Sequence, residues 1–350
     1  MTEKRITDLG EEGLIRRIAR ACEFLAPSGA VGIGDDCAVV PLPGEKVRLV
    51  TTDLLVEDVH FLRSRIPPED LGHKSLAVNL SDIAAMGGTP REAYLSLALP
   101  RDVTLGWVDA FLAGLLELAE ASHTALLGGD TTGSRGPIVV NIAVVGDMPA
   151  GQVRLRSHAR PGDVLCVTGD LGDSAAGLRV LLERHDPTPD LDALVRRHHR
   201  PRPHLAEGRW LARQAGVHAM MDVSDGIDLD LRRLLTASRC GAIVDLERLP
   251  VSDLLRRVAP TRGWCVSDLA CTGGEDYCLL ATVSPEAFDQ VQSEFEARFG
   301  RPLHRIGRLD GSVGSLRYHT AGHVSNPGGR GFDHFGTEQS LPNPARGDET

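Results

Sequence analysis

The sequence predicts a two-domain protein that mixes α+β and α/β architecture. The chain has 350 residues, which is more than one hydrophobic core comfortably holds. Short β-branched runs alternate with longer segments of helical spacing, as expected for sheets covered by helices. A turn-rich stretch at 146–151, Gly-Asp-Met-Pro-Ala-Gly, separates two apolar segments. We therefore predict domains at residues 1–148 and 149–340, followed by a disordered tail at 341–350.

Changes of hydrophobic period give the order of elements in the first half. Leu14, Ile15 and Ile18 have helical spacing, and the β-branched runs after them are bounded by Gly or Pro. The pattern predicts a helix at 14–24, strands at 31–40 and 47–52, a helix at 71–86, a strand at 93–99, a helix at 107–121 and a strand at 138–145.

The second half begins with a similar unit. A strand at 164–168 precedes a glycine-containing loop at 169–172 and a helix at 174–183. The loop is either a phosphate site before a helix or a plain strand-to-helix turn. Residues 187–203 are rich in Pro, Arg and His, which predicts an exposed connection around a short helix.

Composition excludes several classes of protein. The chain has 38 Lys and Arg against 48 Asp and Glu, a formal net charge of −10. Binding of DNA or RNA gains affinity when clustered Lys and Arg displace counterions, so we expect no nucleic-acid partner for this acidic chain. We find no run of about 18 apolar residues and no signal peptide, so we expect no membrane partner and a cytoplasmic location. The seven cysteines contain no C-x-x-C pair, which argues against a disulfide framework and a thiolate zinc site.

Acidic residues recur beside glycines and small residues. One Gly-Asp pair is typical of a turn, because Gly adopts positive φ and Asp bonds its own backbone. Six such segments in one chain indicate a site instead. They lie at 32–36, 51–53, 79–82, 128–130, 222–226 and 273–276.

Two of the acids have an unusual local context. Asp53 follows an apolar run and is expected at the end of a strand. Asp82 lies in the predicted helix at 71–86, where Ser75, Asn79 and Asp82 form one polar stripe at offsets of four and three. Such a stripe either faces solvent or carries function.

Several carboxylates brought together repel one another unless cations neutralise them. Oxygen ligands favour Mg²⁺, which shares its coordination sphere with substrate phosphates, so the acids indicate nucleotide chemistry. Gly32 and Gly34 would let backbone N–H groups approach a phosphate. The chain lacks the G-x-x-x-x-G-K-[ST] loop and a complete dinucleotide fingerprint, so ATP would bind through another architecture.

Eight ordered motifs across residues 10–336 resemble the thiamine-monophosphate kinase family. They are GIGDDCAVV, TTDLLVEDVHF, HKSLAVNLSDIAAMGGTP, GGDTTGS, TGDLGDSAAGL, MDVSDGIDLDL, CTGGEDYCLL and GFDHF. That family belongs to an ATP-binding superfamily with aminoimidazole ribonucleotide synthetase and selenophosphate synthetase. The resemblance implies an N-terminal and a C-terminal domain like those of the synthetase, each with a mixed sheet flanked by helices. It also implies a homodimer built across the N-terminal domains.

The activity that the resemblance implies is ATP-dependent phosphorylation of thiamine monophosphate to thiamine diphosphate, in thiamine biosynthesis, with several Mg²⁺ ions. The positions matching the family's Mg²⁺ ligands are Asp36, Thr51, Thr52, Asp53, Asp82, Asp130, Asp222 and Asp225. Those matching its ATP-binding positions are Gly129, Asp130, Arg156 and Ser224. Those matching its contacts to thiamine monophosphate are His60, Glu275 and Phe332.

The expected mechanism is direct in-line transfer without a phosphoenzyme. The acceptor is a phosphate monoester that is already anionic, so no residue is assigned as a catalytic acid or base. The single-residue assignments have structural alternatives. His60 could be structural, Glu275 could be a turn acid and Phe332 could pack in the core, whereas stacking on a substrate ring is the functional alternative for Phe332.

Other functions stay open on the residues alone. A selenophosphate synthetase would need a reactive Cys and Lys before Gly32, and we find no such pair. An aminoimidazole ribonucleotide synthetase would lack the motifs at 273–276 and at GFDHF. The same acids could also serve a metal-dependent phosphohydrolase or a nucleotide-binding regulatory module. Release of ADP separates these, because only a kinase requires thiamine monophosphate for it.

Overall fold

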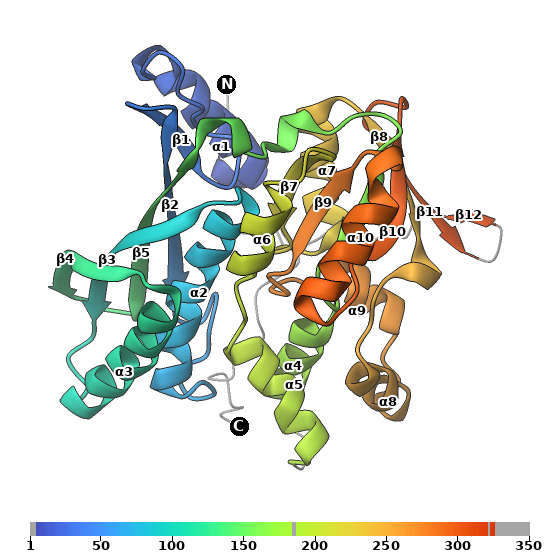
Figure 1. Cartoon of the computed structure of the whole chain (residues 1–350). Helices are drawn as coiled ribbons and strands as arrows, with labels where there is room; N and C mark the ends of the chain where they lie inside the picture. The colour runs from blue at the N-terminus through green and yellow to red at the C-terminus, as the bar shows by residue number, and fades with distance from the viewer. Residues whose placement is uncertain (1–4, 184–186, 321–322, 326–350) are drawn as a thin grey trace.

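The computed structural model describes residues 5–183, 187–320 and 323–325, and it contains two separate sheets (Figure 1). The first sheet is built from strands between Ala38 and Pro149, and the second from strands between Val164 and Ser325. This arrangement confirms the predicted class. The exact division at 148/149 stays a prediction, and the expected tail at 341–350 lies outside the described residues.

The first sheet has five strands in the order β1-β2-β5-β3-β4. Its pairs are antiparallel, except that β3 and β4 run parallel. The strands are β1 (Ala38–Leu42), β2 (Lys46–Val56), β3 (Thr89–Leu99), β4 (Ala125–Gly133) and β5 (Val139–Pro149). The helices of this half are α1 (Gly10–Cys22), α2 (Pro68–Ala85) and α3 (Leu105–Ser122).

Side chains of β2 alternate between the two faces of the first sheet. Val47, Leu49, Thr51 and Leu55 are buried on the face toward α2, and the residues between them are more exposed. Because side chains in a strand repeat every second residue, Asp53 shares the α2 face with Thr51. We call the opposite side of this sheet the outer face.

Helix α2 lies between the two sheets and is buried along most of its length (Figure 1). It packs closely on α3, where a Cβ on Gly72 would lie 1.9 Å from the Phe111 carbonyl oxygen. Ser75 and Asn79 are buried, so the polar stripe predicted on this helix does not face solvent. The polar groups of this helix therefore lie inside the molecule, where they need hydrogen-bond partners.

The second sheet has seven strands in the order β12-β11-β8-β10-β6-β9-β7. The pair β8 and β11 is parallel and the other pairs are antiparallel, so both sheets are mixed. The strands are β6 (Val164–Val167), β7 (Val217–Asp222), β8 (Gly241–Asp245), β9 (Leu279–Val283), β10 (His304–Asp310), β11 (Leu316–Thr320) and β12 (His323–Ser325).

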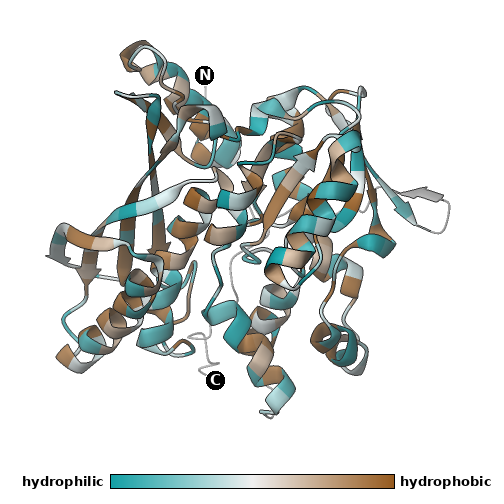
Figure 2. Cartoon of the chain, in the orientation of Figure 1, coloured by the Kyte–Doolittle hydropathy of each residue, from teal (hydrophilic) through white to brown (hydrophobic). Residues whose placement is uncertain are grey.

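The described part of the second half contains seven helices. They are α4 (Asp173–Leu182), α5 (Pro189–His199), α6 (Leu205–Leu211), α7 (Ile227–Ser238), α8 (Asp253–Arg262), α9 (Val266–Thr272) and α10 (Pro285–Phe299). Every residue of β9 is buried, and all of them except Thr282 are apolar. Helix α10 carries both polar and apolar residues around its surface (Figure 2). Among the described helices, none is long and apolar enough to span a bilayer.

Three local expectations were wrong. Residues 128–130, which fall outside the predicted helix at 107–121 and the predicted strand at 138–145, lie inside strand β4. Strand β5 continues through the turn-rich stretch to Pro149, because the pairing with β2 and β3 overrides the local Gly and Pro. The short helix expected within 187–203 is α5, but the segment is not an exposed connection, since α5 buries Leu191, Leu194 and two histidines.

Candidate functional site

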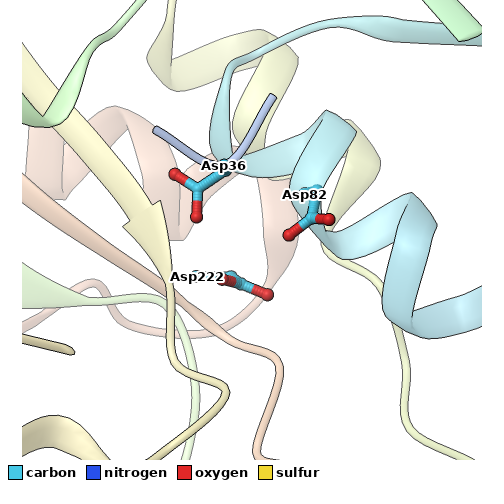
Figure 3. A group of neighbouring side chains, drawn as sticks. All are labelled: Asp36, Asp82 and Asp222. Atoms are coloured by element: carbon cyan, nitrogen blue, oxygen red, sulfur yellow. The ribbon is translucent and has the colours of Figure 1, made fainter. Parts of the chain in front are cut away.

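Three aspartates from distant parts of the chain meet between the two sheets. Asp36 lies just before β1, Asp82 lies in α2 and Asp222 ends β7. Each offers one carboxylate oxygen, and these oxygens lie within 4.8 Å of one another. Figure 3 shows the three carboxylates gathered around one space. The structure thus brings together acids that are up to 186 residues apart (222 − 36).

The carboxylates of this aspartate cluster repel one another in a poorly hydrated place. Burial, followed by repulsion from Asp53 and Asp222, raises the pKa of Asp82 well above its ordinary value. Burial and the neighbouring Asp36 raise the pKa of Asp222 in the same way. A donor set of carboxylate oxygens in which Asp82 and Asp222 resist ionisation without a cation fits a hard ion such as Mg²⁺.

Helix α2 supports the cluster through its neighbouring polar residues. The Ser81 hydroxyl donates to the Asp222 carboxylate at 2.6 Å, and the Thr51 hydroxyl donates to Asp82. Asn79 accepts the backbone N–H of Asp53 at 3.0 Å. The helix therefore fixes acids of both sheets at once, which explains its buried polar residues.

Asp53 and Thr52 are neighbours on β2 but face different sides of the sheet. Burial, then repulsion from Asp225 and Asp36, raises the pKa of Asp53 to about 6. Thr52 instead accepts a hydrogen bond from the Asn141 amide at 2.8 Å on the outer face. The Thr52 side chain is therefore not brought to the aspartate cluster, whereas Asp53 adjoins it.

Arg156 makes an ion pair with the cluster. Its guanidinium nitrogen lies 2.5 Å from a carboxylate oxygen of Asp36, and its backbone N–H donates to Asp35 at 3.0 Å. Burial, followed by the charge of Asp36, raises the pKa of Asp35 to about 7. A cation already sits beside the acids, at a position expected to contact ATP.

The loop after β7 carries Ser224 and Asp225. Their backbone N–H groups both donate to the Asp230 carboxylate at 3.0 Å, and Arg233 pairs with Asp225. The buried Asp230 at the start of α7 therefore holds this loop in shape, a role that the sequence reasoning did not assign. The repeated Asp of the segment Asp-Val-Ser-Asp-Gly-Ile-Asp-Leu-Asp was the available signal.

A cavity of about 970 Å³ adjoins the cluster and is lined by residues of both halves of the chain. The sequence-predicted site residues that line it are Asp53, His60, Ser224, Asp225 and Glu275. The Nδ1 atom of His60 accepts the backbone N–H of Val56 at 3.0 Å. One substrate could thus contact His60 and Glu275 while its other end reaches toward the aspartates.

Glu275 pairs with two residues that the sequence reasoning did not assign to the site. Its Oε2 atom lies 2.9 Å from Nζ of Lys74 and 3.1 Å from Nδ1 of His198. Both partners are buried and line the same cavity. Lys74 lies within a motif carrying the family resemblance, one residue before the polar stripe of Ser75, Asn79 and Asp82, and this position was a usable signal.

Two predicted residues lie on β4, away from the cluster. Asp130 is exposed, and its pairing with Ser96, which itself pairs with Asn141, places it on the outer face. Gly129 has φ of +150°, and a Cβ there would lie 1.6 Å from the Leu95 carbonyl oxygen. Close strand pairing therefore explains this glycine without a nucleotide.

Two further expectations complete the comparison. Phe332 lies outside the described residues.

The loop at 169–172 is tied to the site region by the backbone N–H of Gly172, which donates to Asp276 at 2.8 Å. Because a protein carboxylate takes this N–H, the loop fits the plain strand-to-helix turn better than the phosphate site.

Family models match both halves of the chain. Residues 34–148 match AIR synthase related protein, N-terminal domain, and residues 160–319 match AIR synthase related protein, C-terminal domain. Together they cover most of the described residues, one model for each sheet.

Individual relatives are similar over most of their length. The thiamine-monophosphate kinase of Escherichia coli K12 is 40% identical over 333 residues, which is 94% of this chain and 99% of that protein. That of Bacillus subtilis 168 is 40% identical over 280 residues, 79% of this chain and 84% of that protein. The solved structure of AaThiL complexed with AMPPCP and TMP matches with a TM-score of 0.83 at 34% identity, covering 95% of this chain and 100% of that chain.

Proposed function

The chain belongs to the thiamine-monophosphate kinase family, and from this premise we infer that it phosphorylates thiamine monophosphate to thiamine diphosphate with ATP as the donor. The enzyme is a phosphotransferase of thiamine biosynthesis whose acceptor is itself a phosphate group. The observation that carries the inference is the aspartate cluster together with a neighbouring cavity that Asp53 and Asp225 line and that both halves of the chain enclose. Two polyanions can meet there only if their charge is offset.

We propose that the cluster and its neighbours hold several Mg²⁺ ions. Bound Mg²⁺ would offset the charge of the phosphate oxygens and stabilise the leaving ADP. The donor chemistry of the cluster, with raised pKa values at Asp82 and Asp222, supports this. The proposed ligands around the cluster are Asp36, Thr51, Asp53, Asp82, Asp222 and Asp225. Thr52 and Asp130, which were also expected as ligands, lie on the outer face of the first sheet and are not brought to the cluster.

The chain's other residues would bind and orient the two substrates. We propose Gly129, Asp130, Arg156 and Ser224 for ATP, and His60, Glu275 and Phe332 for thiamine monophosphate. The acceptor oxygen is anionic before it reacts, so the protein needs to align it with the γ-phosphorus rather than remove a proton. Transfer is therefore direct and in line, and no residue of the chain is phosphorylated during turnover.

The proposed enzyme is a cytoplasmic homodimer. We assign residues 1–148 to binding of ATP and Mg²⁺ and to dimerisation, and residues 149–340 to completing the site. The exposure of the Tyr94 ring on the outer face supports an assembly, because another chain covering that face would bury this apolar surface.

Release of ADP tests the function. With ATP and Mg²⁺, we expect ADP only when thiamine monophosphate is present, and none with free thiamine or without Mg²⁺. ADP release without thiamine monophosphate would indicate a phosphohydrolase, and no release in any mixture would indicate a binding module. Trapping of a phosphorylated protein during turnover would contradict direct transfer.

The matched variants Asp82→Asn and Asp102→Asn locate the reaction. Asp82 belongs to the cluster, whereas Asp102 is an exposed partner of Arg63 at the surface. We expect Asp82→Asn to lower kcat by about 10³-fold or more, because it removes a ligand of the proposed metal site, with the fold intact. Asp102→Asn should keep normal activity, and near-normal activity of folded Asp82→Asn would remove Asp82 from the site.

A further inference from the structure

A fully buried lysine lies beside the cavity. The chain has 38 basic residues, and only three of them are lysines, at positions 4, 46 and 74. Lys74, on α2, is 1% exposed. An ammonium ion taken out of water is unfavourable unless it is paired and hydrogen-bonded. In a chain that uses Arg for 35 of its 38 basic residues (38 − 3), a buried Lys indicates that a compact ammonium ion is needed here.

Lys74, Glu275 and His198 form a closed triangle of contacts. Nζ of Lys74 lies 2.9 Å from Oε2 of Glu275 and 3.4 Å from Nε2 of His198. Nδ1 of His198 lies 3.1 Å from the same Oε2 atom and 3.0 Å from the Ser174 hydroxyl. The three residues come from α2, α5 and the loop after α9, so the triangle joins the two halves of the chain.

The partners define where the protons of this triangle lie. An ammonium ion only donates, so Nε2 of His198 accepts from Lys74 and Nδ1 carries the imidazole proton. Burial, and then the charge of Lys74, lowers the pKa of His198 well below its ordinary value, in keeping with a neutral ring. The triangle therefore holds one positive and one negative charge and is neutral as a unit.

The triangle holds the Glu275 carboxylate in one orientation. Lys74 and His198 both contact Oε2, and no described residue makes a hydrogen bond to Oε1. The backbone of Glu275 is also fixed, with φ of +64° and its N–H donating to the Ser224 carbonyl oxygen at 2.7 Å. The side chain is 25% exposed and lines the cavity, so Oε1 can be reached by a ligand there.

A carboxylate already neutralised by Lys74 is a weak counter-ion for a thiazolium ring but a good hydrogen-bond acceptor. Thiamine monophosphate carries one suitable donor, the exocyclic amine of its aminopyrimidine ring.

Lys74 and Asp82 lie eight residues apart on α2, a rise of about 12 Å along the helix. One rigid helix thus separates the end that would recognise the pyrimidine from the acids at the reacting end.

We propose that Lys74 is a positioning residue, which with His198 fixes Glu275 so that Oε1 accepts a hydrogen bond from the exocyclic amine of thiamine monophosphate. This inference rests on the proposed function. Lys74 acts through Glu275 and does not touch the substrate. A purely structural ion pair between the two halves would instead affect stability without changing recognition of the substrate.

Steady-state kinetics of the full-length protein test the role of Lys74. Lys74→Met keeps the apolar stem and removes the charge, and it should raise KM for thiamine monophosphate about 10- to 100-fold, the usual effect of losing a hydrogen bond to a charged group. KM for ATP and kcat should change less than about threefold. Lys46→Met, at an exposed lysine on β2, is the matched control and should behave like the wild type. If Lys74→Met does not fold, Lys74→Gln, which keeps one donor, should give an intermediate KM.

A double variant and a substrate analogue separate the possible outcomes. Added to Glu275→Gln, Lys74→Met should change KM by less than about twofold, because the residue it positions has already been altered. Oxythiamine monophosphate, with a carbonyl in place of the amine, should be a poorer substrate for the wild type, and both single variants should lose this preference. Undiminished effects of Lys74→Met in the double variant, or normal KM and preference in the single variant, would overturn the inference. If the wild type releases no ADP with thiamine monophosphate, the proposed function itself fails.

Discussion

At the scale of single residues, Asp53 shows how its surroundings set the charge of a carboxylate. Its pKa is raised to about 6 from 3.8 by burial and then by Asp225 and Asp36. Between these values the folded protein holds a proton that the unfolded chain releases, so this residue destabilises the fold as pH rises through about 4 to 6. Buried His199, with its pKa lowered to about 4, acts in the opposite direction over a similar range. The pH dependence of the free energy of unfolding therefore combines opposite contributions from the carboxylate and the histidine.

The Mg²⁺-dependent part of the stability isolates the acids. Ligand carboxylates must lose their protons to bind a cation, so Mg²⁺ should raise Tm more at pH 7.5 than at pH 5.5. The histidines contribute to Tm with and without Mg²⁺ and largely cancel in this difference. Thermal unfolding with Mg²⁺ or with EDTA at both pH values provides the measurement. Equal shifts at the two pH values would contradict a metal site built from carboxylates with raised pKa.

At the scale of elements, Gly129 separates a structural role from a nucleotide-binding role. A Cβ at this position would meet the Leu95 carbonyl oxygen at 1.6 Å, with φ of +150°. Gly129→Ala should therefore lower the free energy of unfolding by about 3 kcal/mol or more, by forcing β4 away from β3. Gly128→Ala is the adjacent control, because its Cβ would make only an ordinary contact at 3.6 Å with Tyr94. Urea unfolding that left Gly129→Ala as stable as Gly128→Ala would show that β4 tolerates a side chain there.

Elements with strong periodicity could be predicted from the sequence, and those held by their surroundings could not. The helix predicted at 71–86 is α2, at Pro68–Ala85, but its spacing gave no sign that the polar stripe is buried. Strand β4 was missed because Gly128-Gly129-Asp130 has the composition of a turn, and its exposure at a sheet edge removes any apolar alternation. Pairing with β3 determines its conformation instead.

At the scale of the whole molecule, the individual acids were predictable but their meeting was not. Spacing along the chain says nothing about the approach of Asp36, Asp82 and Asp222, and the resemblance to a family supplied that step. The contact between Lys74 and Glu275 spans 201 residues and joins two halves, so no local pattern contains it. The sequence therefore indicated which residues carry the chemistry of the site, and the fold showed which of them contact one another.

The exposed outer face of the first sheet leads to a prediction about the oligomeric state. Tyr94, on β3, lies on the outer face and is 37% exposed, as expected if a second copy covers this sheet. Light scattering after size exclusion should give a dimer for the wild type. Tyr94→Asp should give a monomer, because an unpaired charge would be buried in the interface. Val313→Asp, at a residue 69% exposed between β10 and β11, should stay dimeric. A monomeric wild type, or a folded Tyr94→Asp variant that remains a dimer, would place the interface elsewhere or exclude it.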